Sequence, residues 1–232
     1  MKRPHPHPSP GALLCVAALG LALGAAPVWA AGGGGPSGGA GGSLGASARG
    51  ARKIAAKKYE SALEYIAKAH AREQSLAEAS PEERARLEKK ARKDYEKALD
   101  KLESSLRRDP LRHEAHSDRG YVLRKLGDYE TALTAYDEAL ALAPRYAPAI
   151  EYRAEAYLEL ERLADVQAAH TRLMRIDRPL ADQLLEKMQA WVARYDPESD
   201  DSASPDLEAF RAWVGARTAA AQDPSSDSSR RW

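Results

Sequence analysis

Hydrophobic and polar residues recur with a helical period along most of the chain, most regularly between His113 and Pro144. Apolar or small residues in this stretch are spaced three and four apart, and the spacing is broken once, at Gly127. Such spacing gathers apolar side chains on one face of a helix. A glycine between two such runs marks a turn. The stretch therefore predicts two consecutive amphipathic helices.

Similar patterns lie on both sides of this pair. Residues 51–79 contain neither proline nor glycine, which favours one long helix. Ser80 followed by Pro81 is typical of a helix start, with the serine as cap, and Asp109-Pro110 stops the helix that follows. The same criteria predict further helices over residues 147–160, 163–176, 179–194 and 206–221. The predicted fold class is all-α.

One sequence signal repeats within these helices. Tyr-Glu-x-Ala-Leu begins at Tyr59, Tyr95 and Tyr129. A fixed period of helical hairpins is typical of a solenoid, in which each unit packs on its neighbours. A step of 34 residues relates Ala115 to Ala149, Gly120 to Ala154, Tyr95 to Tyr129, Ala98 to Ala132 and Pro110 to Pro144.

At these positions the sequence resembles the tetratricopeptide repeat family. The residues that match the family pattern best are Gly120, Tyr129, Ala132, Tyr136, Ala139 and Pro144. The resemblance is specific over residues 112–179 and partial over residues 57–110. It implies a tetratricopeptide-type solenoid of antiparallel helical hairpins, with a long helix before the repeats and capping helices after them.

The chain departs from the family pattern at three positions. His116 stands where an aromatic residue is usual, and we expect it to pack between helices rather than bind a metal. Arg119 and Arg153 stand where leucine is usual. Burying an unpaired guanidinium is costly, so we expect these side chains to point their heads outward or to pair with a carboxylate.

The ends of the chain predict export and flexible connections. Lys2 and Arg3, an apolar run from Gly11 to Ala26 and the sequence Val-Trp-Ala ending at Ala30 are typical of a cleaved secretory signal. We expect an exported bacterial protein, periplasmic or secreted. The predicted organisation is 1–30 signal peptide, 31–50 Gly-rich flexible linker, 51–112 N-terminal helices with a degenerate repeat, 113–178 two repeats, 179–195 capping helix, 196–205 acidic linker, 206–221 C-terminal helix and 222–232 disordered tail.

No constellation of residues predicts catalysis or a cofactor. His113 and His116 are three apart, which is not the four-residue spacing of a zinc-binding helix. The single cysteine, Cys15, lies in the predicted signal. No phosphate-binding loop or serine elbow occurs. The sequence therefore predicts a protein that is not an enzyme and has no cofactor and no catalytic or metal site.

The resemblance implies a concave groove lined by the first helix of each repeat. The groove contains tyrosines among charges, which suits peptide binding. The chain has no asparagine, so it lacks the residues of the family's carboxylate-clamp variety, and we expect a basic or neutral peptide. The predicted exposed groove residues are Glu114, Ser117, Asp118, Tyr121, Arg124, Lys125, Glu151, Tyr152, Glu155, Leu158 and Glu159.

Two functions remain open from the sequence. The first is a non-enzymatic scaffold of the bacterial envelope that binds a protein or peptide partner in the groove. The second is an envelope-associated structural protein. Its helices before residue 113 are rich in lysine and arginine, and they would contact an anionic membrane or cell-wall surface. Nucleic acid is not an expected partner. The last helix packs on the array or docks on a partner.

Overall fold

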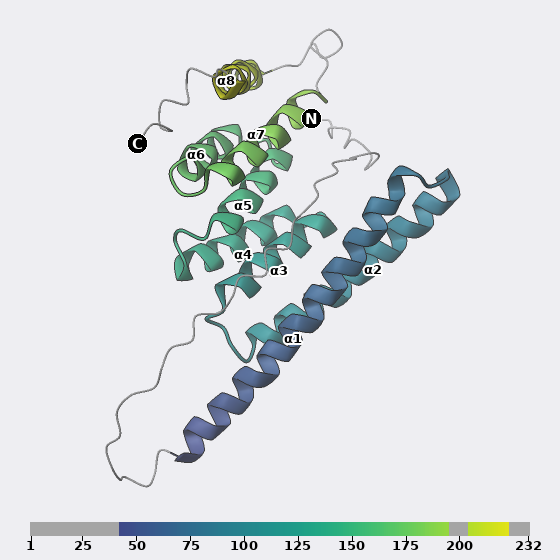
Figure 1. Ribbon diagram of the computed structural model, residues 1–232, viewed down its shortest axis with the longest axis vertical. Helices are drawn as coiled ribbons and strands as arrows, with labels where there is room; N and C mark the ends of the chain where they lie inside the picture. Colours follow the sequence, from purple (N-terminus) through teal and green to yellow (C-terminus); the bar gives the residue numbers. More distant parts are fainter. Residues whose placement is uncertain (1–41, 195–203, 223–232) are drawn as a thin grey trace, which may run out of the picture.

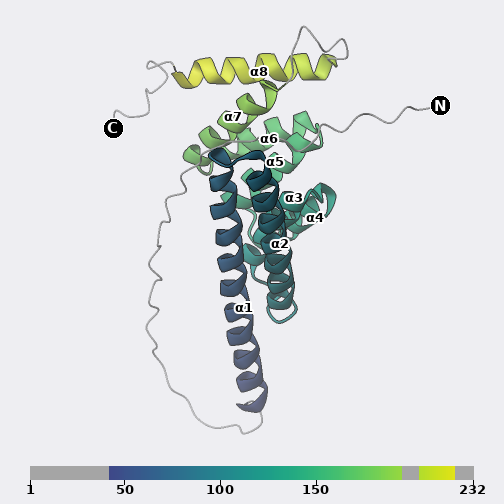
Figure 2. The same ribbon diagram turned by 90° about the vertical axis from the view of Figure 1, so that its right-hand side faces the viewer.

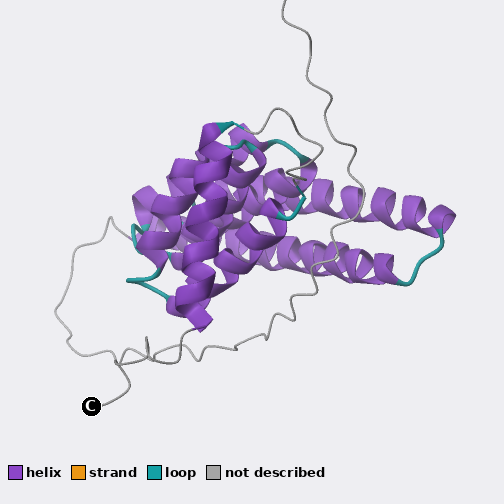
Figure 3. Ribbon diagram, turned by 90° about the horizontal axis from the view of Figure 1, so that it is seen from above, coloured by secondary structure: helices purple, strands orange, loops and turns teal. Residues whose placement is uncertain are grey.

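The computed structural model describes residues 42–194 and 204–222, and all regular structure within them is helical (Figure 3). The predicted all-α fold class is confirmed. The predicted signal peptide and most of the acidic linker and tail lie outside the described residues. The helices are α1 (Gly42–Gln74), a short 3₁₀ turn (Ser75–Ala77), α2 (Pro81–Leu106), α3 (His113–Leu126), α4 (Tyr129–Leu142), α5 (Ala147–Glu159), α6 (Leu163–Leu173), α7 (Arg178–Val192) and α8 (Pro205–Gln222).

The helices form a hairpin and a stack. The long helices α1 and α2 run antiparallel, and the shorter helices α3 to α7 stack beside them (Figure 1). The first turns of α1 extend past the end of α2 in both side views (Figure 2). Helix α8 lies across the far end of the stack, end-on in Figure 1 and lengthwise in Figure 2. The architecture is a helical solenoid with a cap at its C-terminal end.

Local sequence accounts for the ends of several helices. The Ser80 hydroxyl accepts a hydrogen bond from the Glu83 amide at 3.4 Å, with Pro81 in the first helical position, as predicted. Gly127 ends α3 at φ +90°, a conformation that glycine adopts without steric cost. The Asp128 side chain then caps α4 by accepting from the Thr131 amide at 3.3 Å.

Close approach of α3 and α4 depends on a glycine. A Cβ atom at Gly120 would lie 2.6 Å from the Tyr136 ring, closer than packed atoms come. The ring, which is fully buried, therefore lies directly against the α3 backbone. In the next repeat the 34-residue step places Ala154 and His170 at these positions, a larger residue opposite a smaller ring.

Two hydrophobic clusters form the core. One joins α1, α2 and α3 through residues such as Ile66, Tyr95 and Leu102. The other runs from α3 to α8 through residues such as Ile150 and Leu184. Burial of such side chains is the main stabilising contribution in a solenoid with no disulfide.

Helix α8 packs on the end of the array. Phe210 is 1% exposed, and its ring meets Trp191 of α7 edge to face at 5.9 Å. Gln189 of α7 donates a hydrogen bond to the Thr218 hydroxyl at 2.6 Å. Within this chain, α8 therefore covers the apolar face that α6 and α7 would otherwise expose.

One predicted boundary is wrong. The segment 31–50 was expected to be a flexible linker throughout, but α1 begins at Gly42. The residues after Ala51 already form a helix, and each residue that extends a formed helix gains a backbone hydrogen bond without a new nucleation cost. The glycine-rich part before residue 42 lies outside the described residues.

Candidate functional site

The first helices of the two repeats, α3 and α5, bring an aromatic cluster together. The ring centroids of Tyr121 and Tyr152 are 5.1 Å apart, and Tyr152 is 6.5 Å from Tyr136. Tyr121 also meets Tyr95 of α2 at 6.3 Å. Helices α3 and α5 contact each other, and their two predicted groove tyrosines, Tyr121 and Tyr152, meet in this contact.

Helix α1 lies over the α3 part of this face. The Tyr59 hydroxyl donates to the Asp118 carboxylate at 2.6 Å, and burial raises the pKa of Asp118 to about 6. Further along, a 2.5 Å hydrogen bond joins His70 and the Tyr121 hydroxyl.

The ion pair between Lys125 and Glu73, at 2.8 Å, completes this contact. Burial lowers the pKa of His70. The nearby charge of Glu73 opposes this shift, and the charge of Lys125 adds to it. The predicted groove residues Asp118, Tyr121 and Lys125 thus bind α1 of the same chain.

Helix α7 lies over the α5 part of the face. Lys187 pairs with Glu151 and, at 2.6 Å, with Glu155. Arg124 of α3 reaches Glu155 at 3.0 Å. These four side chains, of which Glu151 is buried and the others are half-buried, form a charge cluster that we call the seam cluster. Burial, together with the charge of Glu155, raises the pKa of Glu151 to about 7 despite Lys187.

Several groove residues are therefore less accessible than predicted. The prediction that Ser117, Glu151 and Leu158 are exposed is wrong, because they are 1%, 1% and 3% exposed. The reason is that α1 and α7 pack against the same face of α3 and α5.

The other predicted groove residues are half-buried, apart from Glu159, which is exposed. Glu159 lies 3.5 Å from Arg194. Glu114 is near Arg112, at 4.0 Å, and His113, at 3.5 Å. Glu114 and Glu159 are the carboxylates of this face that a partner can reach with the least rearrangement.

The sequence interpretation missed the residues that complete the face from other helices. They are Tyr59, His70 and Glu73 of α1, Lys187 of α7, and Arg194 just after α7. Tyr59 carried a signal, since it begins the first Tyr-Glu-x-Ala-Leu. Nothing local connects it to Asp118, because the pairing spans 59 residues.

The three departures from the repeat pattern occupy packing positions as expected. His116 is 9% exposed and lies 2.9 Å from Glu138 and 2.7 Å from the Pro110 carbonyl. Arg119 pairs with Glu138 at 2.7 Å, and Arg153 pairs with Asp137. Both arginine predictions are confirmed.

The described residues contain no group of three or more His, Cys, Asp or Glu side chains placed to hold a metal ion. Over the same part of the chain, no helix has the length and apolar character needed to cross a bilayer.

Comparison with known proteins identifies the repeats. The sequence profile described as "Tetratricopeptide repeat" matches residues 82–147 and 117–165. A solved structure of the first TPR of Spaghetti (RPAP3) bound to HSP90 peptide SRMEEVD is similar at 18% identity and a TM-score of 0.41, over 58% of this chain and 95% of that one. The segment from residue 82 to residue 165 is thus similar to tetratricopeptide repeats.

Proposed function

We propose that this protein is a non-enzymatic scaffold that binds a peptide or protein segment across the first helices of its repeats, α3 and α5. The observation that carries the proposal is the cluster of Tyr121 and Tyr152, two half-buried rings 5.1 Å apart. Tyrosine supplies a large contact area with few rotatable bonds, and it is enriched at binding hot spots. Tetratricopeptide repeats over residues 82–165 support the same reading.

The charge of this face favours a basic or neutral segment. Glu114 and Glu159 flank the tyrosines and have only long ion pairs, of 3.5 to 4.0 Å. The cations Arg124 and Lys125 are held more closely, at 3.0 and 2.8 Å, by carboxylates of this chain. A basic partner would meet complementary charge at the rim, where it speeds association and selects the partner.

A titration tests this assignment. We expect the full chain to bind a fluorescein-labelled hexalysine peptide more tightly than a labelled Gly/Ser peptide of equal length. The double variant Glu114→Lys with Glu159→Lys should weaken hexalysine binding about five- to tenfold, because it reverses two rim charges. The proposal fails if this variant binds hexalysine as the wild type does.

A matched control reverses two carboxylates away from the face. Glu130 of α4 and Glu208 of α8 are exposed, so Glu130→Lys with Glu208→Lys changes the net charge by the same amount. We expect this control to retain hexalysine binding within about twofold. Equal weakening in both variants would show attraction by net charge rather than a site.

We place the scaffold in the bacterial envelope, as a periplasmic or secreted protein. This part of the proposal rests on the signal-like sequence of residues 1–30, which lies outside the described residues. Fractionation of cells that produce the full chain tests it. Recovery of the unprocessed chain in the cytoplasm would contradict export.

A second candidate function is contact with an anionic membrane or cell-wall surface through α1. The stretch from Arg49 to Lys58 carries five basic residues and no acidic one, and Arg52, Lys53 and Lys57 are exposed. We expect this mode to give co-sedimentation with anionic vesicles at low salt and release at high salt. The triple variant Arg52→Glu, Lys53→Glu and Lys57→Glu should abolish it. Binding that does not depend on salt would exclude it.

A further inference from the structure

We propose that a second binding site lies on the outward face of α6 and takes an acidic peptide segment of another protein. The site is a hollow of about 650 Å³. It is separate from the face of α3 and α5, and none of its lining residues belongs to the seam cluster. Its ligand has the opposite charge to the one proposed for that face.

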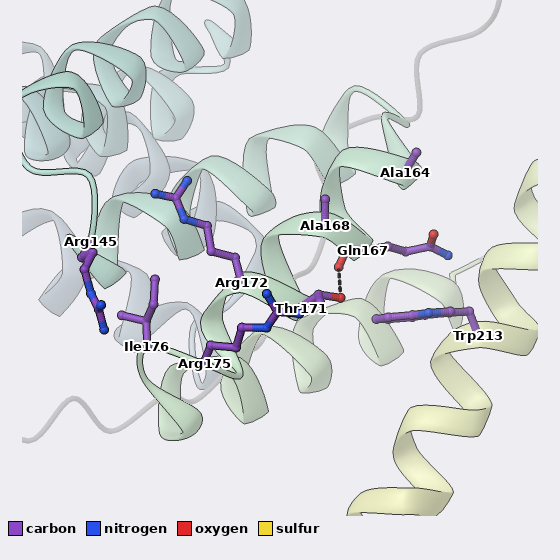
Figure 4. Close-up of a pocket in the computed structure, with 9 residues that line it drawn as sticks. All are labelled: Arg145, Ala164, Gln167, Ala168, Thr171, Arg172, Arg175, Ile176 and Trp213. Carbon is purple, nitrogen blue, oxygen red and sulfur yellow. Dashed lines mark hydrogen bonds between the residues drawn. The ribbon is translucent and has the colours of Figure 1, made fainter.

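One face of α6 forms the floor of the hollow. The lining residues on this helix are spaced three and four apart, so they point the same way. Trp213 of α8 stands at one end of the hollow, and Arg145, from the loop between α4 and α5, stands at the other end beside Ile176 (Figure 4). The lining residues contributed by α6 are Ala164, Gln167, Ala168, Thr171 and Arg172.

The charge of the hollow is of one sign. Arg145, Arg172 and Arg175 contribute three guanidinium groups, and none of the nine lining residues is acidic. Guanidinium groups bind carboxylates through paired hydrogen bonds. Three of them along one elongated surface suit several carboxylates in series better than a single ion.

These arginines have no carboxylate partner within the described residues. Arg145 and Arg175 form no ion pair within the described residues, and Arg172 donates to the Pro144 carbonyl instead. That contact joins α6 to the loop that carries Arg145. The arginines elsewhere in the array that have a carboxylate within 4.0 Å are Arg112, Arg119, Arg124, Arg153, Arg162, Arg178 and Arg194.

Contact between α6 and α8 fixes the position of Trp213 at the aromatic end of the hollow. The Trp213 ring meets His170 of α6 edge to face at 5.4 Å, and Arg217 lies 5.1 Å from its centroid on the same helix. Arg217 adds a fourth positive charge near the hollow. A single tryptophan offers one apolar contact for a peptide side chain, whereas binding of single-stranded nucleic acid uses a series of stacking rings.

The shape and lining favour a peptide over a lipid surface. Ala164, Ala168 and Ile176 give the hollow an apolar component between the arginines. An extended acidic peptide can place carboxylates on the guanidinium groups and its backbone against the polar side chains of Gln167 and Thr171. A flat bilayer surface would reach only the rim of a hollow.

The test is fluorescence anisotropy of a labelled hexaglutamate peptide with the full chain. We expect saturable binding that weakens as salt increases. The double variant Arg145→Glu with Arg175→Glu should weaken this binding at least tenfold. Both residues are exposed and unpaired, so thermal unfolding of the variant should match that of the wild type.

The matched control is Lys89→Glu with Lys90→Glu, which changes the net charge equally on exposed positions of α2. We expect it to bind hexaglutamate within about twofold of the wild type. The proposal is overturned if hexaglutamate does not bind, or if both double variants weaken binding equally.

Two further probes decide the class of ligand. Labelled oligo-dT and anionic phosphatidylserine vesicles should bind the wild type and the pocket variant, Arg145→Glu with Arg175→Glu, alike, or not at all. If either probe binds through Arg145 and Arg175 while hexaglutamate does not, an acidic peptide is the wrong ligand. Hexalysine binding to the face of α3 and α5 should be unchanged in the pocket variant, so the two sites succeed or fail independently.

Discussion

Gly120 lets α3 approach α4 more closely than any residue with a side chain would allow. Its missing Cβ leaves room for the buried Tyr136 ring. The second repeat has Ala154 and His170 at the matching positions. The spacing of α3 and α4 is therefore set by one residue on each helix, Gly120 and Tyr136.

We expect Gly120→Ala to lower the free energy of unfolding by about 1–3 kcal/mol, because the new methyl group overpacks the core. Chemical denaturation measures this. The control is Gly215→Ala on α8, where a Cβ meets nothing within 4 Å. There alanine should be neutral or stabilising by up to about 1 kcal/mol.

The double variant Gly120→Ala with Tyr136→His tests whether the two positions act as a pair. We expect it to lose less stability than the sum of the two single variants, with a coupling of at least about 0.5 kcal/mol. Additive losses would show that the positions do not depend on one another.

Gly127 and Glu161 occupy equivalent turns one repeat apart, both with positive φ, at +90° and +56°. Left-handed backbone costs a residue with a Cβ about 1–2 kcal/mol. We expect Gly127→Ala to lower the free energy of unfolding by about 1 kcal/mol and Glu161→Gly to change it by a smaller amount in the stabilising direction. Urea denaturation compares them, and equal destabilisation by both would contradict this account.

At the scale of the element, local signals predicted the helices well. Ser80, Pro81, Gly127 and Asp128 mark helix ends through hydrogen bonds and backbone angles that involve only near neighbours. The accessibility of the groove could not be predicted in this way. It depends on where α1 and α7 pack, and contacts such as Tyr59 with Asp118 leave no local pattern.

The seam cluster makes the packing of α7 on α5 depend on pH. Burial raises the pKa of Glu151 from 4.5 to about 7. Between these values the folded state binds more protons than the unfolded chain, so its stability falls as pH rises. Asp118, with a pKa raised from 3.8 to about 6, acts in the same direction.

The pKa of Glu155 is shifted in the opposite direction, downward. Although burial would raise its pKa, Arg124 and Lys187 lower it. Its contribution to stability is present above about pH 4.5 and is lost only in more acidic solution. It therefore does not offset Glu151 between pH 5 and pH 8.

We expect Glu151→Gln to reduce the loss of stability between pH 5 and pH 8 by on the order of 1 kcal/mol, since the neutral amide does not titrate. Lys187 keeps Glu155 as a partner. Free energies of unfolding at a series of pH values measure the effect. Glu130→Gln, at an exposed position, should leave the pH dependence as in the wild type. An unchanged slope in Glu151→Gln would contradict the assignment.

At the scale of the whole molecule, α8 closes an array that would otherwise end in an apolar face. Phe210 provides the main buried ring of this contact. Terminal caps of this kind keep solenoids soluble. The hollow on α6 also depends on α8, because Trp213 forms one end of it.

We expect Phe210→Ala to release α8 while α3 to α7 remain folded, because removal of a buried aromatic ring costs about 3–5 kcal/mol. Hydrogen exchange should then become fast in α8 only. Glu208→Ala, an exposed change on the same helix, should keep the slow exchange. Loss of protection throughout the array would show that α8 and the repeats unfold as one unit.

The burial of Glu151 has a consequence for the rate at which a partner binds. A segment that contacts this residue must wait until α7 moves away, which breaks the pairs of Lys187. Its observed association rate should then level off at high concentration, at the rate of opening. The apparent affinity is the intrinsic one reduced by the fraction of molecules that are open. A partner that uses only the tyrosines and the rim carboxylates should bind with no such plateau, so stopped-flow mixing reveals how deeply a ligand enters this face.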